Sequence, residues 1–84
     1  MEDIFLTINE ASMNTGISAH TLRYWEKVFP GILAPFRTKG NQRRYYQEDI
    51  KIILRINKLL KEDLYSIAGA RKVLEKKVKK IQIK

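Results

Sequence analysis

Apolar side chains recur at helical spacing along four stretches of the chain, separated by polar residues, glycine and proline. A period of three to four residues predicts amphipathic helices. The third stretch, about Gln47 to Glu62, is apolar on two sides, so we expect a central helix packed from both directions. The positions that define the helices are Ile8 and Ala11; Leu22, Glu26 and Phe29; Ile50, Ile53, Leu54, Asn57 and Leu60 with Ile52, Ile56 and Leu59; and Ile67, Ala70, Val73 and Leu74.

Capping residues set the ends of the first two helices. Thr7, with Glu10 three residues later, has the spacing of a capping box, and the run 14–16 ends the first helix at a glycine. Ser18 is the expected N-cap of the second helix, which ends near Phe29 because Pro30-Gly31 cannot continue it. Two helices joined by a short glycine-containing turn form a helix-turn-helix, a spacing that many helical hairpins share.

The segment after the second helix predicts a β-hairpin. Residues 36–38 and 43–45 flank a tip, 39–42, in which Gly40 and Asn41 tolerate a positive φ. Alternation along the strands favours an inward face with Phe36 and Tyr45, and an outward face with Arg37, Lys39, Arg43 and Arg44. A basic ribbon beside a helix-turn-helix is a wing, which can lay guanidinium groups along DNA phosphates.

The second helix is expected to expose hydroxyl, basic and phenolic groups. A short helix that buries one stripe and presents such groups suits the major groove of DNA, although an ordinary solvated face has the same pattern. We expect Trp25 to pack in the core. The exposed candidates are Ser18, His20, Thr21, Arg23, Tyr24 and Lys27.

Charge is distributed unevenly along the chain. The 84 residues carry a net charge of +8, and all 17 lysines and arginines follow residue 22. A basic excess on one small domain favours a polyanionic partner, most often nucleic acid, over a lysine-rich surface that only aids solubility. Arginines 23, 37, 43 and 44 lie beside tyrosines 24, 45 and 46, which strengthens that interpretation.

Composition argues against several other classes. The chain has no cysteine and one histidine, so we expect no disulfide, no metal site and no cofactor. The acidic pairs 48–49 and 62–63 lie at predicted helix ends, where capping explains them, so an enzyme is the least favoured class. The apolar runs are too short to span a membrane and the first residues do not form a signal peptide, so we expect a cytoplasmic protein.

Several ordered motifs resemble the DNA-binding domain of MerR-type bacterial transcription regulators. They are Leu6-Thr7-Ile8-Asn9-Glu10-Ala11, Thr15-Gly16-Ile17-Ser18, Thr21-Leu22-Arg23-Tyr24-Trp25-Glu26, Pro35-x-Arg37-Thr38-x-x-Asn41-x-Arg43-x-Tyr45, Glu48-Asp49-Ile50 and the run from Tyr65 to Leu74. The resemblance divides the chain into a winged helix-turn-helix domain, 5–75, and a lysine-rich tail, 76–84, as the start of a truncated dimerisation helix.

The resemblance implies a mostly α fold of about four helices and one hairpin that binds promoter or operator DNA, in full length as a homodimer, with RNA polymerase as an indirect partner. Arg23 and Tyr24 would hold phosphates, the hairpin would grip the backbone and minor-groove edge, and Lys61 would add a phosphate contact. The expected place of action is the nucleoid. The expected DNA-binding residues are Ser18, His20, Thr21, Arg23, Tyr24, Lys27, Arg37, Lys39, Asn41, Arg43, Arg44, Tyr45 and Lys61.

Three features depart from the family pattern. Tyr46 replaces a usual serine or threonine cap, so the third helix could start differently, and Leu64 replaces a usual glycine. The chain stops at Lys84, before the family's long dimerisation helix and effector domain, as an excised module or a small stand-alone protein would. The spacing of Leu74, Val78 and Ile81 predicts the start of a coiled-coil seam, or else a frayed lysine-rich end.

Two alternatives remain beside a regulator module. An excisionase-like or architectural protein shares the small winged fold without an effector domain. A protein-interaction module would grip its partner through Trp25 and Tyr24 on the second helix.

Overall fold

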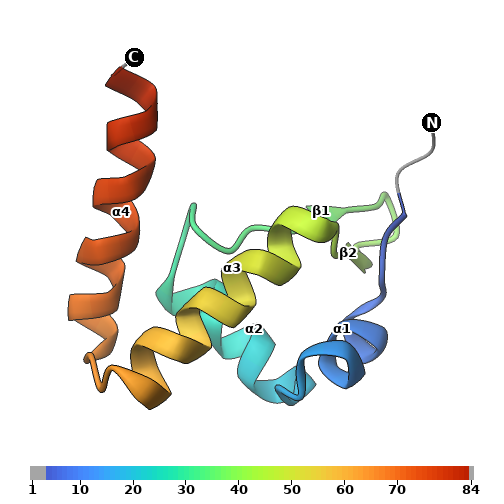
Figure 1. Cartoon of the computed structure of the whole chain (residues 1–84). Helices are drawn as coiled ribbons and strands as arrows, with labels where there is room; N and C mark the ends of the chain where they lie inside the picture. The colour runs from blue at the N-terminus through green and yellow to red at the C-terminus, as the bar shows by residue number, and fades with distance from the viewer. Residues whose placement is uncertain (1–3, 84) are drawn as a thin grey trace.

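The computed structural model describes residues 4–83, with side chains described through residue 76. It confirms a mostly helical fold with one small hairpin (Figure 1). In chain order the elements are α1 (Ile8–Thr15), α2 (Ala19–Val28), β1 (Phe36–Arg37), β2 (Arg43–Arg44), α3 (Gln47–Asn57), a π-helical turn η1 (Lys58–Glu62) and α4 (Ile67–Ile83).

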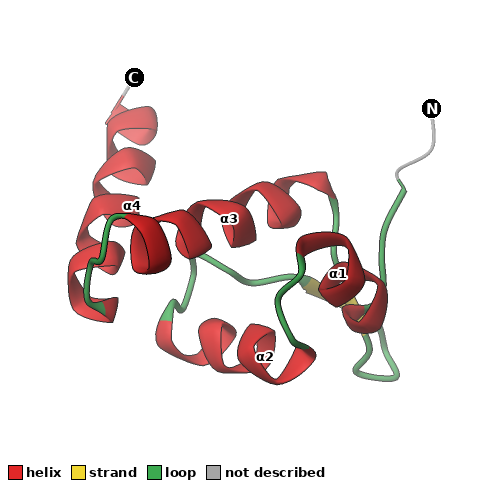
Figure 2. Cartoon of the chain, turned by 60° about the horizontal axis from the view of Figure 1, so that its bottom comes forward, coloured by secondary structure: helices red, strands yellow, loops and turns green. Residues whose placement is uncertain are grey.

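The ends of α1 and α2 form as the sequence predicts. The Thr7 hydroxyl accepts from the Glu10 N–H at 3.2 Å, and the Glu10 carboxylate accepts from the Thr7 N–H at 2.9 Å. Gly16 closes α1 with a φ of 79°, a conformation that costs glycine little. The Ser18 hydroxyl accepts from the Thr21 N–H at 3.1 Å. These caps fix the turn that joins the two helices, which Figure 2 shows below α3.

The hairpin has a different facing from the one predicted. Phe36 pairs with Arg44, and Arg37 pairs with Arg43. Because cross-strand partners share a face and neighbours alternate, Phe36 lies on the opposite face from Tyr45. Tyr45 is fully buried, as expected, whereas Phe36 is 56% exposed. The prediction that both aromatic rings point inward was therefore wrong for Phe36. Arg37 and Arg43 both bond to Glu26 of α2, and Arg37 also stays exposed to solvent.

The hairpin is short and gains support from the N-terminal segment. Leu6 and Tyr45 exchange two backbone hydrogen bonds of 2.8 Å, which adds an isolated bridge beside β2. At the tip Asn41 takes a φ of 66°, as the sequence allowed, while Gly40 does not have a positive φ. Two-residue strands are weak alone, so this extra pairing and contacts to α2 hold the ribbon in place.

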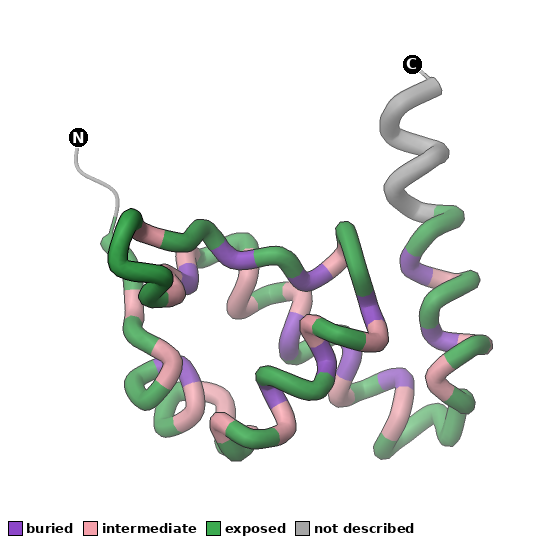
Figure 3. Tube along the Cα trace, turned by 180° about the vertical axis from the view of Figure 1, so that it is seen from behind, coloured by how far each residue is buried: buried purple, intermediate pink, exposed green. Residues whose placement is uncertain are grey.

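The core lies between α3 and the surrounding elements. Ile53 and Ile56 of α3 are fully buried, as are Leu22 and Phe29 near α2, and Trp25 packs with them as expected. Figure 3 shows several buried positions along α2, α3 and the described part of α4, whereas α1 contributes Ala11 alone. Leu54, which the sequence placed on an apolar stripe, is about half exposed.

α3 begins at the predicted residue without a side-chain cap from Tyr46. The carboxylate of Asp49 instead accepts from the Tyr46 N–H at 2.9 Å, which satisfies one free amide at this end. Burial is the main cause that raises the pKa of Asp49, and the Tyr46 hydrogen bond opposes it. The departure from the usual serine or threonine is thus accommodated three residues later.

The α3–α4 corner contains an unusual backbone conformation. Leu64 has a φ of 57° and is 80% exposed, so burial of its side chain contributes little to offset the strain. This is the position where the family pattern has glycine, which adopts that conformation readily. The Ser66 hydroxyl then accepts from the Gly69 N–H at 3.0 Å and caps α4.

α4 extends to Ile83 at the end of α3 away from the hairpin (Figure 1). The predicted seam at Val78 and Ile81 falls outside the residues whose side chains are described. None of the helices described here combines the length and apolar character needed to cross a membrane.

Candidate nucleic-acid interface

The exposed face of α2 carries the candidates expected for it. Leu22 and Trp25 are buried in the core, Val28 packs against it, and the Glu26 side chain is only 11% exposed. Thr21 is half-buried, and the Ser18 hydroxyl donates to its oxygen at 2.9 Å, so these two groups are already bonded to each other. The exposed members are Ser18, His20, Arg23, Tyr24 and Lys27.

A single carboxylate joins α2 to the hairpin. The Arg43 Nε–H donates to both oxygens of Glu26, at 2.9 and 2.8 Å. Arg37 donates from Nη2 to Oε1 at 3.3 Å, and the Tyr45 hydroxyl donates to Oε2 at 2.6 Å. The Glu26 side chain is only 11% exposed. Charged hydrogen bonds in a protected site are stronger than those in water, so this network fixes the hairpin against the helix.

Tyr45 lies beneath this surface instead of within it. Its side chain is fully buried, and burial first, then the hydrogen bond to the Glu26 carboxylate, raises the pKa of its hydroxyl. Tyr45 was predicted from the sequence to contact DNA, and its burial contradicts that prediction. Alternation along the strand places its side chain on the face that packs against α2. It supports the interface through Glu26.

The opposite face of the hairpin holds Arg44 between aromatic rings. Its guanidinium lies 4.5 Å from the centre of the Phe5 ring and 6.0 Å from that of Phe36. Phe5 in turn meets Tyr46 edge-on at 6.0 Å. A ring attracts a cation without neutralising its charge. Within residues 4–76 Arg44 has no carboxylate in ion-pair range, so its charge stays available.

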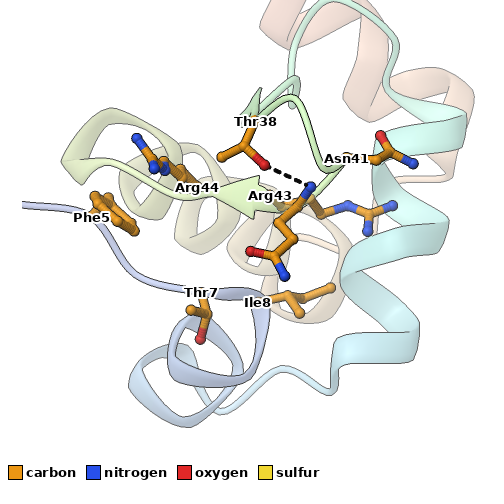
Figure 4. A pocket seen from close by; sticks show the side chains of 8 residues that line it. Phe5, Thr7, Ile8, Thr38, Asn41, Arg43 and Arg44 are labelled. Carbon is orange, nitrogen blue, oxygen red and sulfur yellow. Dashed lines mark hydrogen bonds between the residues drawn. The ribbon is translucent and has the colours of Figure 1, made fainter.

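The hairpin tip and the start of α1 enclose an open cavity of about 380 Å³. Figure 4 shows Thr7 and Ile8 on one side of it, with Thr38, Asn41, Arg43 and Arg44 arriving from the hairpin. The Thr38 oxygen accepts from the Gln42 N–H at 3.2 Å, and Asn41 Oδ1 accepts from Arg37 at 2.9 Å. These bonds order the tip, where Lys39 and Asn41 are exposed.

The structure brings most, but not all, of the predicted residues together. Glu26 ties Arg37 and Arg43 of the hairpin to α2, the helix that carries the first group of candidates, whereas Arg44 lies on the opposite face of the hairpin. Lys61 is exposed in η1, at the end of α3 away from the hairpin (Figure 1). The described residues contain no group of three metal-ligating side chains.

Two contributors were missing from the candidates named from the sequence. Glu26 had been placed on the buried stripe of α2 with Leu22 and Phe29, and a carboxylate there needs a cationic partner. An acidic residue on an apolar stripe, followed by a hairpin rich in arginine, was the sequence feature that could have identified Glu26. Phe5 gave no comparable signal, because its contact with Arg44 depends on the bridge between Leu6 and Tyr45.

Comparison with known proteins agrees with this arrangement. Residues 6–77 match the model described as MerR HTH family regulatory protein. The chain is 40% identical over 57 residues to the HTH-type transcriptional regulator YyaN of Bacillus subtilis, covering 67% of this chain and 40% of YyaN. It is 38% identical over 60 residues to the HTH-type transcriptional regulator GlnR of Bacillus cereus, covering 71% of this chain and 44% of GlnR.

A solved structure shares the fold. HiNmlR, a MerR family regulator lacking the sensor domain and bound to promoter DNA, superposes with a TM-score of 0.70 at 25% identity, over 89% of this chain and 58% of that one. The chain spans less than half the length of the curated relatives it matches. The family match covers most of the sequence, and the chain therefore belongs to the MerR HTH family of regulatory proteins.

Proposed function

We propose that this chain binds double-stranded DNA in a sequence-specific manner, as the DNA-binding module of a bacterial MerR-type transcription regulator. α2 enters the major groove while the hairpin lies along the neighbouring phosphates. The observation that carries the proposal is the network around Glu26: exposed Arg23 lies three residues before it, and two of the three hairpin arginines, Arg37 and Arg43, bond to it. Residues three apart share one side of a helix, so cations from both elements gather together.

Each exposed candidate has a distinct part in this proposal. Arg23 and Tyr24 hold phosphates, and the polar side chains at the start of α2 meet base edges. Arg44 and Lys39 supply charge from the hairpin, and Lys61 adds a more distant phosphate contact. The net charge of +8 supports a polyanionic partner.

The same proposal covers the cellular setting. The chain acts in the cytoplasm at the nucleoid, as a regulator without catalytic activity. In a longer protein two such modules, joined through a C-terminal helix that follows α4, read two half-sites about one helical turn, ~34 Å, apart. RNA polymerase then responds to the shape of the promoter instead of contacting this module.

Selection of bound sequences from a random duplex pool tests the proposal. We expect one enriched half-site, binding that weakens steeply as salt rises, and a loss of about 1–3 kcal/mol in binding free energy for Arg23→Ala. Fluorescence anisotropy with the selected duplex measures the last two. A pool that shows no enrichment, together with no retained duplex at low salt, would overturn DNA binding and favour the protein-interaction alternative.

A further inference from the structure

A carboxylate on a DNA-facing helix is unfavourable on simple electrostatic grounds, yet Glu26 sits in α2 next to the basic hairpin. We propose that Glu26 is a positioning residue, which sets the register of the hairpin against α2 and so raises specific binding while it lowers non-specific binding. The inference rests on the proposed function, because it concerns how the same surface discriminates among DNA sequences.

The bonds around Glu26 have the geometry of an anchor. Both of its carboxylate oxygens are used, and its three partners come from β1, β2 and the residue after β2. Arg43 contacts both oxygens, and its side chain is only 19% exposed. Several hydrogen bonds from different points of a ribbon restrict its rotation as well as its distance from the helix. Strands of two residues cannot set this orientation by themselves.

The same bonds reduce the positive charge that the hairpin offers to DNA. Arg43 and Arg37 share the charge of one carboxylate, whereas Arg44 on the other face pairs with no carboxylate of residues 4–76. Non-specific binding depends on the number of phosphates neutralised, so it should gain when Glu26 loses its charge. Specific binding also requires α2 and the hairpin to reach their contacts at the same time, so the affinity for the specific site should fall when Glu26 loses its charge. The two affinities are thus expected to move in opposite directions.

The test compares Glu26→Gln with the unmodified chain on two duplexes, one selected from a random pool and one with the same bases scrambled. We expect the affinity for the selected duplex to fall at least five-fold, and the affinity for the scrambled duplex to stay level or rise up to three-fold. Glu75→Gln removes a carboxylate on α4 whose ion-pair partner among the side chains described is Arg71, at 3.8 Å, and it should leave the ratio of the two affinities unchanged.

A second variant separates position from charge. Glu26→Asp keeps the negative charge, but its shorter side chain cannot reach Arg43 and Tyr45 together, so it should also lower the affinity for the selected duplex. NMR of the arginine Nε–H groups follows the anchor directly. The Arg43 signal should move toward that of a free arginine in both variants, while the backbone signals of α3 stay in place. If Glu26→Gln does not fold, Glu26→Asp and its Arg43 signal carry the test.

The outcomes distinguish this inference from the proposed function. If the unmodified chain prefers neither duplex, sequence-specific binding itself fails. If the unmodified chain prefers the selected duplex and Glu26→Gln binds both duplexes more tightly by the same factor, Glu26 acts only as a charge and the positioning inference is overturned. An unchanged affinity ratio in a folded Glu26→Asp variant would overturn it as well.

Discussion

Arg43 and Arg44 are neighbours in β2, yet alternation along the strand sends their side chains to opposite faces of the hairpin. On the face toward α2, Arg43 meets a carboxylate at 2.8 Å. On the face toward the N-terminal segment, Arg44 rests 4.5 Å from the centre of an aromatic ring. Both guanidinium groups are held in place, but among the described side chains only Arg43 has a carboxylate partner.

The comparison shows that the two faces of this small hairpin have different roles, one in orientation and the other in presenting positive charge. An ion pair that is largely protected from water fixes direction strongly, at the expense of the field that the cation presents. An aromatic ring fixes direction less strongly and leaves that field intact. The face toward α2 therefore sets the orientation of the hairpin, and the other face keeps a cation for the phosphates. Changes to the two faces should have different consequences for stability and for binding.

The largest difference is expected between Arg43→Met and Arg44→Met. Arg43→Met leaves the mostly buried Glu26 carboxylate with Arg37 and Tyr45 alone, so the free energy of unfolding should fall by about 2–3 kcal/mol. Arg44→Met removes a contact with aromatic rings, and should cost about 1 kcal/mol or less. Urea unfolding followed by circular dichroism measures both. Equal losses for the two variants would contradict the division between the faces.

Tyr45→Phe tests the same anchor through pH. Burial, followed by the bond to Glu26, raises the pKa of Tyr45 above its ordinary value in the folded chain. Its contribution to stability is thus complete below the unfolded pKa of about 10, and is lost as pH rises above it. The variant lacks one hydrogen bond to a charged acceptor and should be less stable by about 1–2 kcal/mol at pH 7.

The difference in unfolding free energy between the unmodified chain and Tyr45→Phe should shrink as the solution becomes alkaline. Tyr45→Phe has no hydroxyl to titrate at this position, so its unfolding free energy should fall less steeply above about pH 10. Urea unfolding at several pH values from neutral to alkaline gives the two curves. If they stay parallel over that range, the hydroxyl of Tyr45 does not couple to folding in the way the Glu26 contact indicates.

Local features of this fold could be predicted from the sequence because they depend on neighbouring residues. The capping box at Thr7, the left-handed Gly16 and the Ser18 cap each involve groups within four positions of one another. The polar face of α2 follows from its period alone. The presence of a hairpin could also be predicted, because the turn at residues 39–42 depends on local sequence and not on how the strands pack against the helices.

The facing of the hairpin could not be predicted in the same way. Alternation gives two answers that differ by one residue of register, and a slip of one residue exchanges the faces. The prediction that Phe36 and Tyr45 both point inward required a register one residue away from the observed pairing of Phe36 with Arg44. The deciding contacts, Glu26 with Arg43 and Leu6 with Tyr45, join residues far apart in the chain. The burial of Tyr45, and its loss as a DNA contact, follow from the same pairing.

The smallest expected effect is on the aromatic face. Phe5→Leu keeps an apolar side chain but removes the ring nearest to Arg44, so Arg44 should be less ordered while retaining its charge. Loss of a contact of about 0.5–1 kcal/mol corresponds to a two- to five-fold weaker affinity for the selected duplex. The salt dependence of binding should be unchanged, because the number of cations is the same. Arg44→Gln should instead reduce the salt slope by about one contact.

Phe36→Leu is the matched control for Phe5→Leu, since its ring lies farther from the same guanidinium, at 6.0 Å. We expect a smaller loss of affinity from it than from Phe5→Leu, with both measured by fluorescence anisotropy at the same salt concentration. If Phe5→Leu leaves the affinity untouched while Arg44→Gln lowers both affinity and salt slope, Arg44 reaches the phosphates without the ring. The aromatic face would then supply charge alone, and the orientation of both arginines would have to come from the backbone of β2.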